Sequence, residues 1–129
     1  TAADLRELKS IYRSRIRWDK SGLLAEYLAA LHLQRQGYNF LNHRLKSRFA
    51  ELDLVFVRED GFFLFEVKQV QDGWESEVFR PRQMRRLGKV AQAYRRDRGE
   101  NVFFGLVLVD TEANVEVIED VLALDESFD

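Results

Sequence analysis

The stretch Glu51-Leu52-Asp53-Leu54-Val55-Phe56-Val57, followed by Phe62-Phe63-Leu64-Phe65-Glu66-Val67-Lys68, decides the fold of this chain. Both segments are rich in aromatic and β-branched residues, which is typical of β-strands. Between them stands Asp60-Gly61, a dipeptide that favours the two-residue turn of a hairpin. We therefore predict a β-hairpin at the centre of the fold.

The turn sets the pairing of the two strands. With Asp60-Gly61 as the loop, Asp53 lies opposite Lys68 and Val55 lies opposite Glu66. Because side chains alternate along a strand, the charged residues of the hairpin then share one face: Glu51, Asp53, Glu66 and Lys68. The other face is filled by apolar side chains: Leu52, Leu54, Phe56, Phe63, Phe65 and Val67.

Charges within such apolar strands suggest a function, because an unpaired buried charge costs several kcal/mol. Asp53 and Glu66 can bind a divalent metal, with the Val67 carbonyl as an extra ligand, and a bound metal activates water and polarises a phosphodiester. Lys68 would position that water or offset the charge that builds on phosphate oxygens. Glu51 is a weaker candidate at the strand end. The alternative is a cross-strand ion pair, which contributes at most about 1 kcal/mol when exposed.

A second candidate residue lies on the helix predicted over residues 21–36, which Ser21 would cap and Gly37 would end. Glu26 is the only charged residue between positions 22 and 31, and a helix that is apolar nearly all round is buried. Its carboxylate therefore needs a cation or a metal. We expect Glu26 to complete or orient the metal shell; the alternatives are a solvent-facing seam between Ala residues or a pair with an Arg.

The remaining pattern predicts one α/β (α+β) domain over residues 1–129, in which helices flank a central mixed β-sheet. Residues 1–20 include a basic N-terminal helix over 3–17, residues 21–109 form the core, and residues 110–129 form an acidic C-terminal segment. The other predicted elements are an edge strand over 38–46, a helix over 81–98, a buried strand over 102–109, a strand over 115–118 and a short closing element over 119–124.

Composition narrows the chemistry. The chain has no Cys and two His, which excludes disulfides and thiolate sites and leaves too few His for a His-rich zinc site. A metal site must therefore rest on carboxylates, which favours Mg²⁺ or Mn²⁺. No apolar run approaches the ~18 residues of a membrane span and no signal peptide is visible, so we expect a cytoplasmic protein without membrane segments.

The net charge of −2 conceals a segregation of charge along the chain. Residues 80–98 carry eight Arg or Lys and one acid, whereas residues 110–129 carry eight acids and no basic residue. The helix over 81–98 therefore predicts a surface for nucleic-acid phosphates, the alternative being a solvated helix face. Its candidate binding residues are Arg82, Arg85, Arg86 and Lys89. Trp74 could stack on a base or cover the core, and His32 and His43 are interpreted as structural or exposed.

These residues resemble the PD-(D/E)XK nuclease superfamily, in the order Glu26, Asp53, then Glu66-x-Lys68. From about Ser21 to Val109, the chain is similar more closely to the YraN-like bacterial proteins, related in fold to archaeal Holliday junction resolvases. The supporting motifs are Gly37-Tyr38-Asn39-Phe40-Leu41, Arg48-Phe49-Ala50-Glu51-Leu52-Asp53-Leu54, Phe65-Glu66-Val67-Lys68 and, loosely, Pro81-Arg82-Gln83-Met84-Arg85-Arg86-Leu87. The departures are Ala25 and Ala50 for a usual Gly, Arg44 for a common Asn, Val70 for an Arg and Arg82 for a Lys.

The resemblance implies a restriction endonuclease-like core and a metal-dependent endonuclease that hydrolyses DNA, including branched or junction DNA. Resolvase-like relatives are dimers, so it also implies a homodimer able to make two symmetric cuts. Two alternatives remain open. One is a non-catalytic nucleic-acid-binding module on the same fold, and the other is a protein-interaction domain whose acidic C-terminal segment recruits a basic partner.

Overall fold

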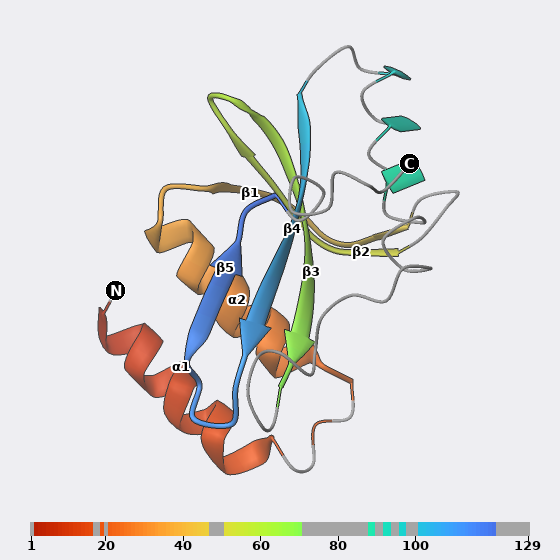
Figure 1. Ribbon diagram of the computed structural model, residues 1–129. Helices are drawn as coiled ribbons and strands as arrows, with labels where there is room; N and C mark the ends of the chain where they lie inside the picture. The colour runs from red at the N-terminus through yellow and green to blue at the C-terminus, as the bar shows by residue number, and fades with distance from the viewer. Residues whose placement is uncertain are drawn as a thin grey trace.

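The computed structural model describes residues 2–16, 19, 21–46, 51–70, 88–89, 92–93, 96–97 and 101–120. Its elements are α1 (Ala2–Arg15), α2 (Leu23–Arg35), β1 (Asn39–Lys46), β2 (Glu51–Arg58), β3 (Gly61–Gln69), β4 (Val102–Val109) and β5 (Val115–Ile118). The strands form one sheet in the order β1-β2-β3-β4-β5 (Figure 1). Only β3 and β4 run parallel, so the sheet is mixed and the predicted α+β fold is confirmed.

Apolar side chains from alternate positions build a core on each face of the sheet. One cluster joins α1 and α2 to the sheet, with Tyr12 and Leu28 packed against Phe56 and Phe65. The other face carries a second cluster that includes Val55, Leu64 and Phe104. Both helices therefore cover the same face, and Figure 1 shows α2 crossing behind the strands. Burying such side chains contributes about 1.5–3 kcal/mol each.

The start of α2 is fixed by three residues that precede it. Gly22 is the N-cap, in the left-handed region at φ 78°, one residue later than the predicted cap. Ser21 still contributes, because its Oγ accepts the Leu23 N–H at 3.2 Å. Asp19 accepts the Leu24 N–H at 2.9 Å, and its hydrogen bond from the Ser21 hydroxyl lowers the pKa of Asp19. These acceptors satisfy N–H groups that a helix end leaves unpaired.

The hairpin forms as predicted, but its register differs by two residues. Arg58 pairs with Gly61 and Val55 pairs with Leu64, so Glu59 and Asp60 form the turn. Gly61 is the first residue of β3 because it pairs with Arg58. A glycine is required there, since its φ is 143° and a Cβ would lie 2.4 Å from the Asn101 carbonyl oxygen. The prediction that Val55 faces Glu66 was therefore wrong. A shift of two residues leaves every regularly alternating side chain on its predicted face.

The two strands of the hairpin separate at a fork. Pairing between β2 and β3 ends at Leu54 and Phe65. The β1–β2 pairing continues to Lys46 and Glu51, and the β3–β4 pairing continues to Gln69 and Val109. Figure 1 shows β2 and β3 diverging from their shared turn. The predicted pairing of Asp53 with Lys68 is therefore not formed.

The fork also changes the position of Leu52. Leu52 belongs to the cluster that contains Val55 and Leu64, not to the cluster that contains Leu54. The regular alternation of β2 is thus broken between Leu52 and Leu54, on either side of Asp53. The prediction that Leu52 shares a face with Leu54 was wrong because it assumed a regular strand up to its first residue.

Candidate functional site

Asp53 lies at the fork and bonds across it. Its Oδ2 accepts the main-chain N–H of Val67 at 2.8 Å. In β3, the N–H groups of Phe62 and its even-numbered neighbours face β4, as the bond from Phe62 to the Asn101 carbonyl shows. The N–H of Val67 therefore faces β2, where no main-chain partner follows Leu54. The carboxylate of Asp53 takes the place of that partner, because a buried N–H left unpaired is costly.

The surroundings of Asp53 disfavour its charge. Burial raises the pKa of Asp53; the Val67 N–H lowers it, and the charges of Glu26 and Glu51 raise it again. The charge of Lys68 also lowers this pKa. The structure therefore brings two further carboxylates and one ammonium within electrostatic range of Asp53. Such perturbed acids are typical of functional sites, although structural ion pairs also produce them.

Glu66 and Lys68 occupy the part of β3 that continues beyond the fork. Both side chains are half-buried, and their spacing of two residues puts them on one face of the strand. Pairing with Leu106 and Leu108 of β4 holds their backbone in place. The predicted sharing of a face by these two residues is confirmed.

Glu26 projects from the first turn of α2 and is 7% exposed. Its Oε1 accepts from His43 Nε2 at 2.7 Å and from Arg44 Nε at 2.8 Å. Arg44 Nη2 also lies 3.3 Å from Oε2. Among the alternatives for this buried carboxylate, the ion pair with an Arg is therefore formed. A carboxylate at a helix N-terminus gains further from the helix dipole.

Gly22 and Gln69 show how the helix meets the end of β3. A Cβ placed on Gly22 would lie 3.5 Å from Glu26 Oε2 and 3.9 Å from Gln69 Nε2. The Glu26 carboxylate therefore lies beside the last residue of β3, one residue beyond Lys68.

Sequence reasoning missed His43 and Arg44 as partners of Glu26. Arg44 was recognised only as a departure from a common Asn, and His43 was interpreted as structural or exposed. The signal that could have found them is the unpaired acid itself, because a buried carboxylate on α2 requires a cation from a neighbouring element. The strand β1 follows α2 directly and supplies both residues.

The donor set can be compared with the needs of a divalent cation. Within the described residues, no three His, Asp or Glu side chains are grouped closely enough to hold a metal ion. Mg²⁺, however, is usually bound by one or two carboxylates together with water and substrate phosphates. Asp53 accepts one N–H, and an ionised carboxylate has further lone pairs for a cation. Asp53 therefore keeps lone pairs for such an ion and Glu66 has the same donor chemistry, whereas Glu26 is already held by Arg44 and His43.

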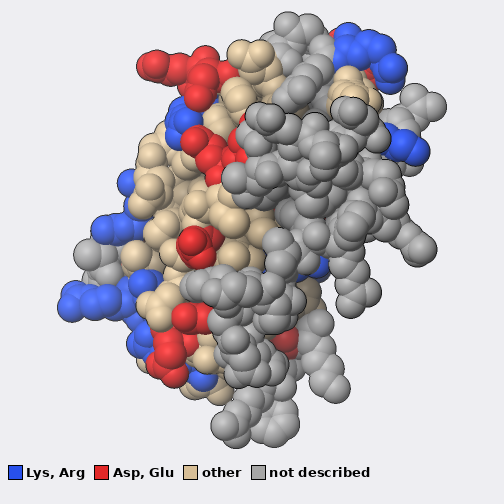
Figure 2. All heavy atoms as spheres, in the orientation of Figure 1, with Lys and Arg blue, Asp and Glu red and all other residues tan. Residues whose placement is uncertain are grey.

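The predicted nucleic-acid-binding residues are only partly described. Arg82, Arg85 and Arg86 lie outside the described residues, as does Trp74, and the described Lys89 is exposed and helical. Figure 2 shows Lys and Arg side chains along the flank where Figure 1 places α1 and the end of α2. Burial lowers the pKa of His32, and the charges of Lys9 and Arg35 lower it further, so cations of both helices gather there.

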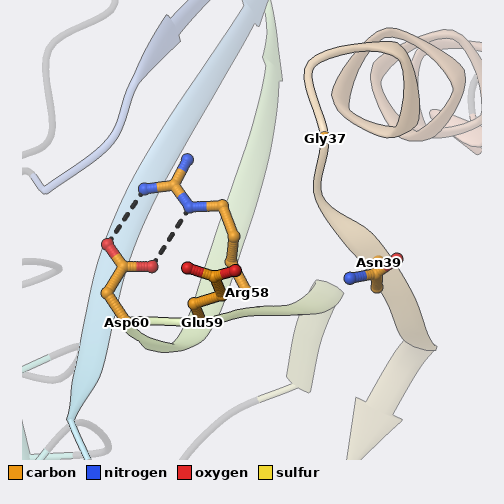
Figure 3. Close-up of a pocket in the computed structure, with 5 residues that line it drawn as sticks. All are labelled: Gly37, Asn39, Arg58, Glu59 and Asp60. Atoms are coloured by element: carbon orange, nitrogen blue, oxygen red, sulfur yellow. Dashed lines mark hydrogen bonds and ion pairs between the residues drawn. The ribbon is translucent and has the colours of Figure 1, made fainter.

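A polar pocket of about 560 Å³ lies at the opposite end of β2 from Asp53. Its lining residues are Gly37, Asn39, Arg58, Glu59 and Asp60, drawn in Figure 3. Arg58 is paired there with Asp60 at 3.0 Å and also with Glu119. The Arg58 guanidinium is thus engaged within the protein, and the pocket is separate from the site at the fork.

Comparison with known proteins places the chain among bacterial relatives. The family model described as "Uncharacterised protein family UPF0102" matches residues 25–119, and confirms the YraN-like resemblance at the level of the family. UPF0102 proteins of Shewanella denitrificans, Rhodopseudomonas palustris and Magnetococcus marinus are 36%, 39% and 30% identical to it. These matches cover 57%, 63% and 80% of this chain and 71%, 63% and 91% of the three relatives. No described helix is long and apolar enough to cross a membrane.

Proposed function

We propose that this chain, which belongs to the uncharacterised protein family UPF0102, is a divalent-metal-dependent endonuclease that hydrolyses DNA phosphodiester bonds. The observation that carries the proposal is the position of Asp53 at the fork, within electrostatic range of Glu26, Glu51 and Lys68. The proposal places the chain in the PD-(D/E)XK nuclease superfamily. The five-stranded mixed sheet with its two helices is consistent with a restriction-endonuclease-like core.

Each charged residue at the fork would have a distinct role. Asp53 and Glu66 would hold Mg²⁺ or Mn²⁺, which when bound polarises the scissile phosphate and lowers the pKa of a water molecule. Lys68 would orient the attacking water or offset the negative charge that develops on the phosphate oxygens. Glu26 would orient the site from α2 while it is held by Arg44. The hydrogen bond from Val67 keeps Asp53 in one position, which pre-organises the site.

The substrate proposed is DNA, with branched and junction DNA as the structures to examine first. The basic residues of the 81–98 segment and the cations of α1 and α2 would contact phosphates without reading the base sequence. A homodimer would place two sites for two symmetric cuts. We propose the cytoplasm as its location, where DNA lies in bacteria such as the relatives named above.

A cleavage assay tests this function directly. Labelled single-stranded, duplex, flap and four-way-junction DNA are incubated with the protein and Mg²⁺, Mn²⁺ or EDTA. We expect cleavage that needs the metal and that is lost in Asp53→Asn and in Lys68→Ala. Asp60→Asn makes the same chemical change at the far end of β2, and it should cut like the wild type. Cleavage that survives Asp53→Asn would refute the proposed site.

A non-catalytic nucleic-acid-binding module is the second candidate. The observation that favours it is the pair between Glu26 and Arg44, because a cation already neutralises one of the expected metal ligands. This candidate predicts DNA binding that weakens with salt, no cleavage with either metal, and binding that is unchanged or stronger in Asp53→Asn. Absence of both binding and cleavage would instead favour a protein partner.

A further inference from the structure

We propose that Arg44 is a positioning residue that holds Glu26 as its counter-ion and thereby sets how tightly the site at the fork binds a divalent cation. The inference rests on the proposed function, because it concerns the metal of the same site. It assigns to this chain a residue-level control of metal affinity, exerted through Glu26 rather than by contact with the metal.

The contacts of Arg44 account for both oxygens of the Glu26 carboxylate. Its Nε donates to Oε1 at 2.8 Å and its Nη2 lies 3.3 Å from Oε2. Nη2 also donates to the Ser21 carbonyl at 2.9 Å, which ties the guanidinium to the start of α2. A planar guanidinium held by three such contacts is a specific arrangement, since its fork of donors matches a carboxylate.

The backbone of β1 is shaped to bring two donors to one acceptor. Consecutive side chains of a regular strand point to opposite faces, yet His43 and Arg44 both donate to Glu26 Oε1. Arg44 has a φ of 53°, in the left-handed region that residues other than Gly seldom adopt. This backbone breaks the alternation at Arg44. Such strain persists only where the surroundings fix it.

Arg44 stands opposite Asp53 in the sheet, because its neighbours His43 and Leu45 pair with Leu54 and Leu52. The hydrogen bond with Glu26 raises the pKa of Arg44, as does the charge of Glu26, and the charges of Glu51 and Asp53 raise it further. A fixed positive charge in that position offsets part of the negative charge of the site. Arg44 therefore opposes a divalent cation in two ways: it occupies the Glu26 carboxylate and it repels the cation.

Arg44 and a metal ion would compete for the same partner, the Glu26 carboxylate. Glu26 is bonded to Arg44, and Arg44 lies across from Asp53 in the pairing of β1 with β2. The Glu26 side chain is 10% exposed, so without Arg44 its charge would lose its strongest partner in a poorly hydrated position. A metal ion bound at Asp53 would then be the available substitute. The gain in metal affinity on removal of Arg44 should consequently depend on Glu26.

Calorimetric titration of the protein with Mn²⁺ alone tests this inference without any nucleic acid. We expect Arg44→Gln to bind Mn²⁺ at least about tenfold more tightly than the wild type, which corresponds to about 1.4 kcal/mol. Arg44→Lys should lie between the wild type and Arg44→Gln, because it keeps the positive charge but loses the paired donors of the guanidinium. In Glu26→Gln/Arg44→Gln the gain should disappear. Arg44→Met, which keeps the aliphatic stem, serves as a second neutral variant if Arg44→Gln folds poorly.

Arg58→Gln is the matched control, because Arg58 is also paired with carboxylates but at the far end of β2. Its Mn²⁺ affinity should equal that of the wild type. Equal affinities in the wild type and both neutral Arg44 variants would overturn the inference, and so would a gain that persists without Glu26, or no Mn²⁺ binding by those variants. Mn²⁺ binding in the expected pattern without DNA cleavage would retain the inference and refute the nuclease. DNA cleavage together with a Mn²⁺ affinity that is the same with and without Arg44 would support the nuclease and refute the inference.

Discussion

The main-chain N–H of Val67 donates to Oδ2 of Asp53 at 2.8 Å, across the point where β2 leaves β3. A side chain thus replaces a missing main-chain acceptor in the sheet. The same carboxylate is the centre of the proposed site. The fold needs its oxygen as a hydrogen-bond acceptor, whereas the proposed function needs its negative charge. Substitutions at this position should separate the two demands.

Asp53→Asn should raise stability at neutral pH while it abolishes any cleavage. Burial raises the pKa of Asp53, so the folded state disfavours the charged form. This penalty is absent below the unfolded pKa near 3.8 and is complete once the pH exceeds the folded pKa. The amide removes the charge and keeps an oxygen for the Val67 N–H. Urea unfolding at pH 7 should show a higher midpoint for Asp53→Asn than for the wild type.

Asp53→Ala is the companion variant, because it removes the acceptor as well as the charge. The Val67 N–H would then be left unpaired, which costs about 1–3 kcal/mol. The order of stability expected at pH 7 is Asn, then Asp, then Ala. Equal midpoints for the Asn and Ala variants would show that the hydrogen bond contributes nothing.

Tyr38 gives the fold a dependence on high pH. Its hydroxyl donates to Glu119 at 2.6 Å, and burial together with this bond raises the pKa of Tyr38 to about 12. A tyrosine in the unfolded chain has a pKa near 10. The folded state therefore holds the proton more tightly, and this stability is complete below pH ~10 and is lost as the pH rises through 12.

Tyr38→Phe should lower the free energy of unfolding at pH 7 by about 1 kcal/mol. In this variant, stability should also fall less steeply as the pH rises above 10. Thermal unfolding between pH 9 and pH 12 measures both effects. Tyr12, whose pKa is also raised by burial, contributes to the remaining decline. An unchanged decline in Tyr38→Phe would contradict the assignment.

Gly61 and Gly37 form a matched pair for testing the register of the hairpin. Both have positive φ, 143° for Gly61 and 97° for Gly37. A Cβ on Gly61 would lie 2.4 Å from the Asn101 carbonyl oxygen, whereas a Cβ on Gly37 would meet nothing within 4 Å. Gly37→Ala should therefore cost only the left-handed strain of about 1–2 kcal/mol. Gly61→Ala should cost clearly more, and chemical denaturation that ranks them equally would contradict the observed close approach.

Asp19→Ala should weaken the start of α2. Asp19 accepts the Leu24 N–H and the Ser21 hydroxyl, and loss of such a cap costs about 1 kcal/mol. The hydrogen bond from Ser21 lowers the pKa of Asp19, so its contribution is present above the unfolded pKa and is lost as the pH falls. The wild type and the variant should consequently converge in acid. Glu7→Ala, at an exposed position of α1, should change stability by less than about 0.5 kcal/mol.

Much of the fold followed from local pattern. The strands Val102–Val109 and Val115–Ile118 have the predicted bounds, because each is an apolar or alternating run between polar residues. The hairpin was found, but the Asp-Gly rule misplaced its turn. That rule considers only the loop, whereas the Asn101 carbonyl beside Gly61 belongs to the residue just before β4, forty positions later in the chain. Contacts of this range are not available to a local rule.

The candidate site was predictable in part for the same reason. Glu66 and Lys68 share a face because strand alternation is local, and a register shift of two residues preserves it. The fork could not be read from one segment, because beyond it β2 stays paired with β1 and β3 stays paired with β4. The partners of Glu26 depend on the left-handed backbone of Arg44, which residue type did not indicate.

The double duty of Asp53 has a consequence for how this family should diverge. If the proposed function holds, a lineage that lost cleavage would no longer need a negative charge at this position, but its sheet would still need an acceptor for the Val67 N–H. Selection for folding alone would then permit Asn and resist Ala. Inactive descendants should accordingly be recognisable by an amide at this position together with an altered Lys68. An Asp at this position is therefore not by itself a sign of activity, because it also satisfies the Val67 N–H.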